Sequence, residues 1–244
     1  MKLQDLFKIL SWDVLNPFLL KIKKNRIYKI GRHTGINLGC GLDNPPNWIG
    51  IDGGITLFFV HKFPKCISRF LFKIFRMSQN YSFDEYHKKA KSLKLIHHEL
   101  LYGIPFFDNT IPNIYSSHFF EHIFLTDARY LLNECYRVLR PSGVMRIAVP
   151  SLDEEIKNIE KALKEYKIGN IDQVQHYVTS EIIGFNDRYS NHRYMYNFDK
   201  LKILFEEFGF KNIKQHKFKE GAIPDVELLD TRESLFVEAF KLKI

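Results

Sequence analysis

Short apolar segments alternate with amphipathic segments along most of the chain. Seven runs rich in β-branched or aromatic residues predict strands: Thr34–Leu38, Trp48–Ile51, Leu95–His98, Ile114–Ser116, Val144–Val149, Asn212–Phe218 and Ser234–Lys241. Helical spacing predicts a helix capped by Thr126, a helix-rich stretch over 152–183, and a helix over Asp199–Phe208 that Gly209 ends. This alternation predicts an α/β fold with an open, mostly parallel sheet, whose ligands bind beyond the carboxyl ends of the strands.

Two further segments are amphipathic and basic. Residues 1–35 carry a net charge of +6 and residues 57–97 one of +7, so the rest of the chain is acidic within the total of +8. The apolar faces are formed by Leu3, Leu6, Phe7 and Leu10 in the first segment and by Ile67, Phe70, Leu71, Ile74 and Phe75 in the second, with Arg69, Lys73 and Arg76 opposite. Such helices either bind an anionic membrane surface or pack on their own domain with their cations in water.

Length and composition narrow the class of protein. With 244 residues and 45% hydrophobic side chains the chain can form one packed domain, which excludes a disordered or fibrous protein. Cys40, Cys66 and Cys135 are too few for a disulfide framework and fit a reducing compartment. No apolar run reaches the roughly 18 residues of a membrane span, so we expect a cytoplasmic protein.

The ends of the first four predicted strands carry residues suited to a nucleotide-like cofactor. The first strand runs into Gly39–Gly41, a turn in which missing Cβ atoms let the backbone approach a ligand. Asp52 ends the second strand, where a carboxylate can accept from ribose hydroxyls. After the third strand, Glu99 can accept from an adenine amino group while the Leu100 amide donates to the ring, and His118 follows the fourth strand. A tight turn without a ligand is the alternative for the glycine segment.

These residues lie in segments that resemble class I S-adenosylmethionine-dependent methyltransferases. The segments are Asn37–Gly41, Trp48–Asp52, Ile104–Phe106, Ser117–His122 and Glu134–Gly143. The chain looks most like a type-11-like group associated with surface-polysaccharide or lipopolysaccharide biosynthesis, which carries motifs similar to Asn191–Tyr196 and Asp230–Leu235. The resemblance spans about residues 35–241, apart from the second basic segment.

The resemblance implies one Rossmann-like methyltransferase domain over residues 1–244, with a seven-stranded sheet whose last strand is reversed and with helices on both faces. It implies S-adenosyl-L-methionine as cofactor, held by Asn37, Leu38, Gly39, Cys40, Gly41, Asp52, Glu99, Leu100, Ser117 and His118. Residues 1–33 are then an N-terminal basic segment, and residues 57–94 a helical insert that overhangs the cleft as a lid. Asn37 stands where an acidic residue is usual, and the short interval from Gly41 to Asp52 predicts a truncated first helix.

Methyl transfer to a hydroxyl calls for a general base, and the candidates are His118 and His122, with Glu121 as an orienting partner. A capping or core role is the alternative for His122. The candidates for acceptor binding are His192, Arg193, Tyr194 and Tyr196, which alternatively form an interface between a loop and the sheet. We expect no metal, because the His-x-x-x-His spacing lacks the zinc-protease glutamate and no third ligand is evident in the sequence.

Together these observations predict a methyltransferase that O-methylates a sugar, a sugar phosphate or a lipid-linked glycan precursor, with peripheral membrane contact through the basic helices. A nucleic-acid methyltransferase is one alternative, suggested by the net charge. It is disfavoured because Asn44–Asn47 (Asn-Pro-Pro-Asn) follows the first strand and lacks the ring that stacks a flipped base. A non-catalytic cofactor-binding scaffold, docked on a membrane or a glycan-synthesis complex, is the other.

Overall fold

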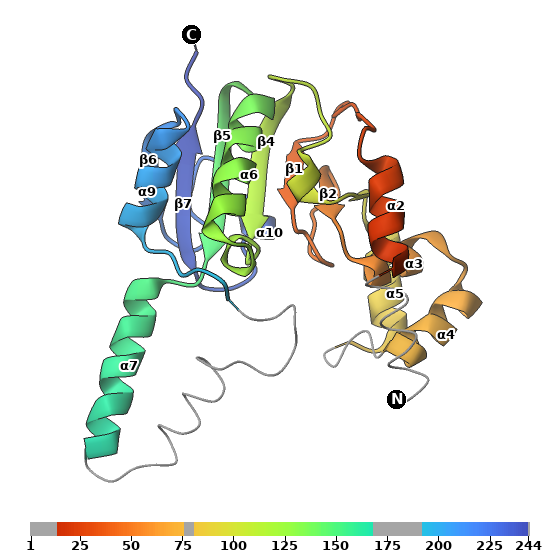
Figure 1. Cartoon of the computed structure of the whole chain (residues 1–244), viewed down its shortest axis with the longest axis horizontal. Coiled ribbons are helices and arrows are strands. Elements are labelled where there is room, and N and C mark those ends of the chain that lie inside the picture. Colours follow the sequence, from red (N-terminus) through yellow and green to blue (C-terminus); the bar gives the residue numbers. More distant parts are fainter. Residues whose placement is uncertain (1–13, 76–80, 168–191, 244) are drawn as a thin grey trace.

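A seven-stranded sheet organises the chain in the computed structural model, which describes residues 14–75, 81–167 and 192–243 (Figure 1). The strands are β1 Gly35–Leu38, β2 Trp48–Asp52, β3 Leu95–His97, β4 Ile111–Ser117, β5 Leu139–Val149, β6 Lys211–His216 and β7 Leu235–Phe240. They lie in the order β3-β2-β1-β4-β5-β7-β6, and β7 runs antiparallel to β5 and β6 while the other pairs are parallel. The predicted α/β sheet with its reversed last strand is confirmed.

The helices cover the two faces of this sheet unequally. They are α2 Asn16–Lys23, α3 Ile55–Lys62, α4 Lys65–Phe75, α5 Phe83–Ser92, α6 Leu125–Val138, α7 Leu152–Lys167, α9 Phe198–Glu207 and α10 Val226–Leu229. On one face α6 and α9 share the main hydrophobic core with the strands (Figure 1). The opposite face has a smaller core around Trp48 and Tyr115, which packs against Ile223 and Leu229 from the connection between β6 and β7.

The predicted helix ends have different outcomes. At the end of α9, Gly209 has a φ of +91°, its N–H donates to Glu206 O, and the Phe210 N–H donates to Phe205 O, as expected. The cap predicted at Thr126 is wrong, because α6 already begins at Leu125 and no side chain caps it. The first part of the stretch predicted over 152–183 is α7, whereas the rest of it and the helix predicted around Leu3–Leu10 lie outside the described residues.

The connection between β1 and β2 contains no helix. Residues 39–47 form turns, held where the Asn37 amide donates to Asp43 O at 2.9 Å and the Asn44 amide to Trp48 O at 2.8 Å. Parallel strands are usually joined by a crossover of about a dozen residues or more, most often a helix. The first helix is therefore replaced by these turns, not merely shortened. On the sheet face that carries Asn37 and its register partner Tyr115, the connection between β6 and β7 packs against Tyr115.

The basic insert between β2 and β3 forms α3, α4 and α5, and α4 packs on a different face from the one predicted. Ile67 and Phe70 are 44% and 63% exposed. Arg69, expected in water, lies 4.7 Å over the Phe83 ring and 3.3 Å from Asp84 at the start of α5. Negative charge is favoured in the first turn of a helix, and the first turn of α5 is acidic. This turn therefore attracts the cations of α4. Ile74, Phe75 and Arg76 lie outside the described side chains.

A buried ion cluster ties this face of the sheet to the connection between β6 and β7. Arg146 of β5 lies 2.6 Å from Asp230 Oδ2 and 3.1 Å from Glu238 Oε1, and all three side chains are fully buried. The guanidinium also donates to the carbonyl oxygens of Lys217 and Glu220. Asp230, the first residue of the motif ahead of the last strand, accepts from Arg146 Nε at 3.1 Å and from Nη2 at 2.6 Å.

Arg146→Leu is expected to lower the free energy of unfolding by about 3–5 kcal/mol, because it leaves two buried carboxylates without their cation. Urea unfolding followed by circular dichroism measures this loss. Arg140→Leu, at an exposed position of the same strand, is the matched control and should change stability by no more than about 0.5 kcal/mol. Equal stability of the two variants would show that the cluster is not required.

His97, at the end of β3, is held neutral under α2. Its Nδ1 accepts from Lys23 Nζ at 2.9 Å, and its Nε2 lies 3.0 Å from Asn16 Oδ1. Burial, together with the charge of Lys23, lowers the pKa of His97 to about 4. An unfolded histidine has a pKa near 6.5. Between these values the unfolded chain therefore binds a proton that the folded chain does not.

Stability should consequently fall as the pH drops from about 6.5 to 4, by up to about 3 kcal/mol from this residue. Unfolding free energies measured at half-unit steps of pH test this. His97→Gln should flatten the slope, whereas His33→Gln, before β1, should keep it. The assignment fails if the two variants show the same slope.

Candidate active site

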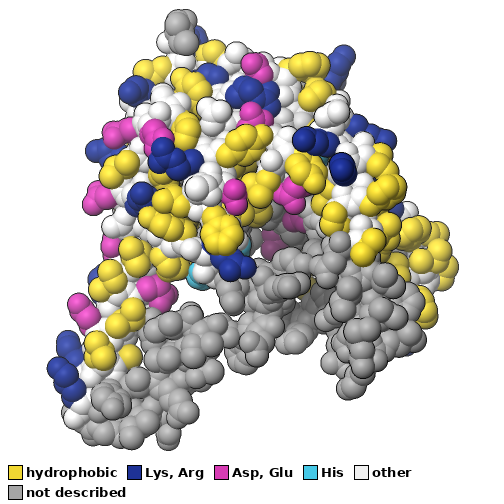
Figure 2. All heavy atoms as spheres, in the orientation of Figure 1, with side chains coloured by type: hydrophobic (Ala, Val, Ile, Leu, Met, Phe, Trp, Pro, Cys, Tyr) yellow, Lys and Arg dark blue, Asp and Glu magenta, His cyan; other side chains and the backbone are white. Residues whose placement is uncertain are grey.

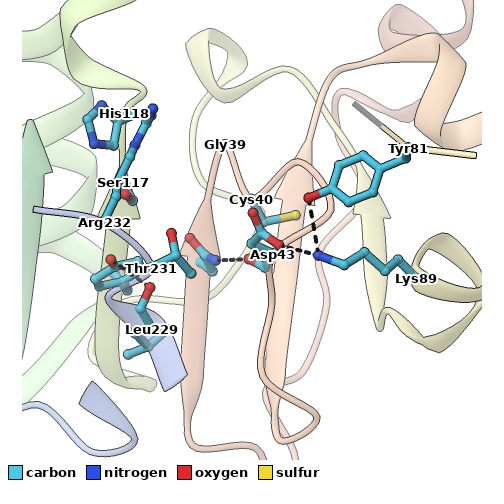
Figure 3. Close-up of a pocket in the computed structure, with 12 residues that line it drawn as sticks. Gly39, Cys40, Asp43, Tyr81, Lys89, Ser117, His118, Leu229, Thr231 and Arg232 are labelled. Carbon is cyan, nitrogen blue, oxygen red and sulfur yellow. Dashed lines mark hydrogen bonds and ion pairs between the residues drawn. The ribbon is translucent and has the colours of Figure 1, made fainter. Parts of the chain in front are cut away.

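A cleft of about 560 Å³ opens at the carboxyl ends of β1 and β4, where the strand order reverses (Figure 3). Ligands of open α/β sheets bind at this position. The cleft is lined by Asn37, Gly39, Cys40, Asp43, Tyr81, Lys89, Tyr115, Ser117, His118, Leu229, Thr231 and Arg232. In Figure 3 the end of β1 lies in the middle, with His118 and Arg232 on one side and Tyr81 and Lys89 on the other.

The glycine turn after β1 has the backbone shape that the sequence predicts. Gly39 and Gly41 have φ values of +65° and +51°, and a Cβ on Gly39 would lie 2.4 Å from the Phe119 ring. The Asp52 carboxylate fixes this turn, since it accepts from the Gly41 N–H at 3.0 Å and the Gly54 N–H at 2.7 Å. Burial raises the pKa of Asp52, and these two N–H groups oppose that effect. Each carboxylate oxygen has a further lone pair with which to accept from a ribose hydroxyl.

Asn37 presents an acceptor to the cleft. Its amide nitrogen is used by Asp43 O, but among the described residues its buried Oδ1 has no hydrogen-bond partner. A buried acceptor left unpaired costs about 1–3 kcal/mol. The ammonium group of a ligand would satisfy this acceptor. Because the asparagine oxygen is neutral, the contact would be a hydrogen bond and not the salt bridge that an acidic residue would form. This orphaned oxygen and the glycine turn fit the methionine end of S-adenosylmethionine.

The remaining residues predicted to bind the cofactor occupy different places. Leu38 is fully buried in the core, and Cys40 is a buried thiol whose pKa is raised by burial. Glu99 Oε1 accepts from the Leu101 N–H at 3.1 Å at the start of a 3₁₀ turn, Leu100–Tyr102. The cleft therefore unites Asn37, Gly39, Cys40, Ser117 and His118, while Asp52, Glu99 and Leu100 lie at the ends of the next two strands.

His118 is held in an unusual backbone conformation at the end of β4. Its φ is +49°, which is rare for a residue other than glycine and is typical of functional positions. Nδ1 lies 3.0 Å from Glu121 Oε1, and Nε2 lies 2.8 Å from Ser234 Oγ. With Glu121 as the acceptor at Nδ1, the neutral ring carries its proton there and presents Nε2 as a base.

His122 does not share a helix face with His118. Residues Phe120–His122 form a 3₁₀ turn, and His122 does not line the cleft but packs edge-on against His192, with ring centroids 5.2 Å apart. The segment that carries His192 is held where the N–H groups of Arg193 and Tyr194 donate to the Glu121 carbonyl oxygen. The fold thus brings together His122, a catalytic candidate, and His192, a candidate for acceptor binding.

Among the residues predicted to bind the acceptor, Tyr196 needs a correction. Its side chain is fully buried in the main core, where the ring lies 5.0 Å from that of Tyr194. The backbone of Tyr196 pairs with Ser151 in an isolated bridge, so the residue joins its loop to the sheet, as in the alternative interpretation. Arg193 is exposed and stacks over Phe124 at 5.3 Å, while Tyr194 is half-buried.

The sequence did not single out several residues of the cleft. Asp43 forms an ion pair with Lys89 of α5 at 2.9 Å, and Lys89 also reaches the Tyr81 hydroxyl at 3.4 Å. Thr231 and Arg232 come from the motif before β7, which was noted without a role in the cleft. Tyr81 and Lys89 had no signal of their own, because their place depends on how the insert folds back.

A family model of known proteins matches part of the sequence. Residues 64–147 match the family model of a methyltransferase domain, a stretch that includes Glu99 and Ser117–His122 but not the glycine turn. None of the curated proteins matches the sequence.

Solved structures are similar at low identity. An S-adenosylmethionine-dependent methyltransferase from Archaeoglobus fulgidus has a TM-score of 0.42 at 15% identity, covering 98% of this chain and 100% of the other. A Haemonchus contortus phosphoethanolamine N-methyltransferase, in complex with phosphomonomethylethanolamine and S-adenosylhomocysteine, has a TM-score of 0.45 at 15% identity. The alignment covers 95% of this chain but 53% of that one, so the chain spans about half of its length. Residues 64–147 thus resemble a methyltransferase domain.

Asn37→Ala should weaken the binding of S-adenosylmethionine about 5–15-fold, because the cofactor loses the acceptor that the cleft provides. Isothermal titration calorimetry with the purified chain measures the change. Asn113→Ala is the matched control, since Asn113 lies on β4 toward the other end of the strand, where it donates to Thr34 O. Unchanged affinity in Asn37→Ala would exclude the contact.

Proposed function

We propose that the protein transfers the methyl group to a hydroxyl of a sugar or glycan-precursor acceptor, with His118 as general base. The observation that carries this proposal is the position of His118 in the cleft. Its Nδ1 is bound to Glu121, and its Nε2 lies on the side of the ring away from Glu121. These two polar partners fix the orientation of the ring. A general base must be held in this way, because it has to reach one particular acceptor hydroxyl.

The reaction needs few groups from the protein. When bound, S-adenosylmethionine supplies a methyl group already activated as a sulfonium. His118 Nε2 would take the proton of the acceptor hydroxyl, and for this Ser234 must give up its contact with the ring. Glu121 stabilises the imidazolium that results, because its carboxylate is buried beside Nδ1. The walls of the cleft align the acceptor and exclude water.

The polar lining of the cleft supports an acceptor with several hydroxyls. Asp43, Tyr81 and Thr231 offer hydrogen-bonding oxygens, and Lys89 and Arg232 offer cations on opposite walls (Figure 3). A sugar phosphate would place its anion between these cations. This chemistry is consistent with a role in surface-polysaccharide synthesis, which rests on the family resemblance.

An acceptor linked to lipid would bring the protein to a membrane surface, and α4 is suited to that contact. Hydrophobic side chains gather over α4 in Figure 2, and Ile67 and Phe70 are largely exposed beside Lys73. Among the described residues, none of the helices has the length and apolar content to cross a membrane. We therefore propose peripheral contact through α4, which co-sedimentation with anionic vesicles tests by comparing the native chain with a Phe70→Ser variant.

His118→Gln should lower turnover about 10²–10⁴-fold and leave cofactor affinity within a few-fold, because the base is lost while the turn after β1 is kept. Transfer of labelled methyl groups to nucleotide sugars, sugar phosphates and lipid-linked glycans measures turnover. His61→Gln, in α3, is the control. Full turnover in His118→Gln would overturn the assignment of the base.

The same assay separates the alternatives. Transfer to oligonucleotides, with binding that falls steeply as salt rises, would identify a nucleic-acid methyltransferase. Cofactor binding without transfer to any acceptor class would favour the non-catalytic scaffold. Either result would overturn the proposal of sugar O-methylation.

A further inference from the structure

Three potential metal ligands converge beside the cleft, two from the turn after β4 and one from the segment before α9. Glu121, His122 and His192 each offer one ligand atom, and these atoms lie within 4.8 Å of one another. Among the described residues, no other cluster of His, Cys, Asp and Glu side chains brings three such atoms together. We propose that these residues form a binding site for a divalent transition-metal ion.

The carboxylate supplies the strongest indication. Glu121 is 1% exposed, and its Oε1 is occupied by His118 Nδ1 at 3.0 Å. Its second oxygen, Oε2, is buried and has no hydrogen-bond partner among the described residues. An unpaired buried carboxylate oxygen is costly, and buried charges in proteins are paired or coordinate metals. A cation at Oε2 satisfies this oxygen without disturbing the bond to His118.

The two histidines are brought to the carboxylate by the backbone. His122 is adjacent to Glu121 in the 3₁₀ turn, and its Nε2 lies 3.9 Å from Glu121 Oε1. His192 precedes the two residues whose N–H groups donate to the Glu121 carbonyl oxygen, the shorter of these bonds being 2.6 Å from Arg193. This pairing places the imidazole of His192 against that of His122. The third ligand missing from the sequence pattern thus comes from a distant segment.

The ligand set indicates which class of ion would bind. Two imidazoles and one carboxylate suit Zn²⁺, Fe²⁺ or Co²⁺, whereas Mg²⁺ prefers oxygen ligands. In a tetrahedral site with bonds of about 2.0–2.1 Å the ligand atoms are about 3.4 Å apart, so the site must contract on binding. The exposed His192 side chain can make that movement, because solvent surrounds it.

Metal binding would join the segment that begins at His192 to the Glu121 carboxylate, which orients His118. Glu121 would then hold the base with one oxygen and the ion with the other. His122 would be a ligand rather than a second base, which agrees with its position away from the cleft lining. Binding of the ion is independent of the acceptor, so this proposal stands or fails separately from the proposed function.

The test uses the full chain, treated with chelator and dialysed. Titration with Zn²⁺ in a calorimeter should show one ion per chain, and Mg²⁺ should show no comparable binding. His192→Ala should weaken Zn²⁺ binding by about 10–100-fold or more, since it removes a ligand. His33→Ala removes a histidine that lies before β1, away from the proposed site, and this variant should bind Zn²⁺ as the native chain does. His192 is exposed, so its loss is not expected to unfold the protein.

Substitution with Co²⁺ gives a second readout, because visible absorption bands report coordination by protein ligands. The native chain and His33→Ala should show these bands, and His192→Ala and Glu121→Gln should lose them. Absence of stoichiometric Zn²⁺ binding, or equal affinity in the native chain and His192→Ala, would overturn the proposal. Neither readout involves methyl transfer, so failure of the sugar acceptor leaves the result interpretable.

Discussion

The cleft depends on the buried guanidinium of Arg146. One wall of the cleft belongs to the connection between β6 and β7, which has little regular structure of its own, so something must hold it to the sheet. Arg146 does this by binding carboxylates at two points of the chain, Asp230 just before the wall residues and Glu238 on β7. Tyr115 reinforces the arrangement by donating to Leu229 O. Buried ion pairs contribute little net stability, but they define one geometry because a shifted partner leaves a bare charge.

Glu121 has a comparable position in the turn after β4. Its carboxylate orients the proposed base, its backbone oxygen accepts from two N–H groups of the segment beginning at His192, and its other carboxylate oxygen has no hydrogen-bond partner among the described residues. A single residue of a short turn therefore links the end of β4 with a segment more than 70 positions later.

Much of the sheet could be predicted from the sequence because strand periodicity and glycine turns are local signals. The strands around Asn37, Asp52 and His118, and the helix end at Gly209, follow from residues within one or two turns of each site. The face on which α4 packs could not be predicted, since it depends on Asp84 in another helix. The neighbours of His192 and Lys89 could not be predicted for the same reason: each acquires them from a pairing between distant segments. Tyr196 shows the converse error. Its motif has side chains suited to binding an acceptor, but the side chain of Tyr196 is part of the core.

The absence of a helix between β1 and β2 has a thermodynamic consequence. In its place the second wall of the cleft is made by the basic insert. Two contacts hold the insert to this connection: an ion pair between the exposed side chains of Lys89 and Asp43, and Leu42, which packs against the hydrophobic cluster of the insert. Exposed ion pairs of this kind contribute about 0–1 kcal/mol. Apolar packing of the insert therefore does most to hold this wall in place, and the affinity for a ligand that touches both walls is linked to the stability of the insert. Substitutions within α4 and α5 can thus tune affinity without altering any residue that contacts the ligand.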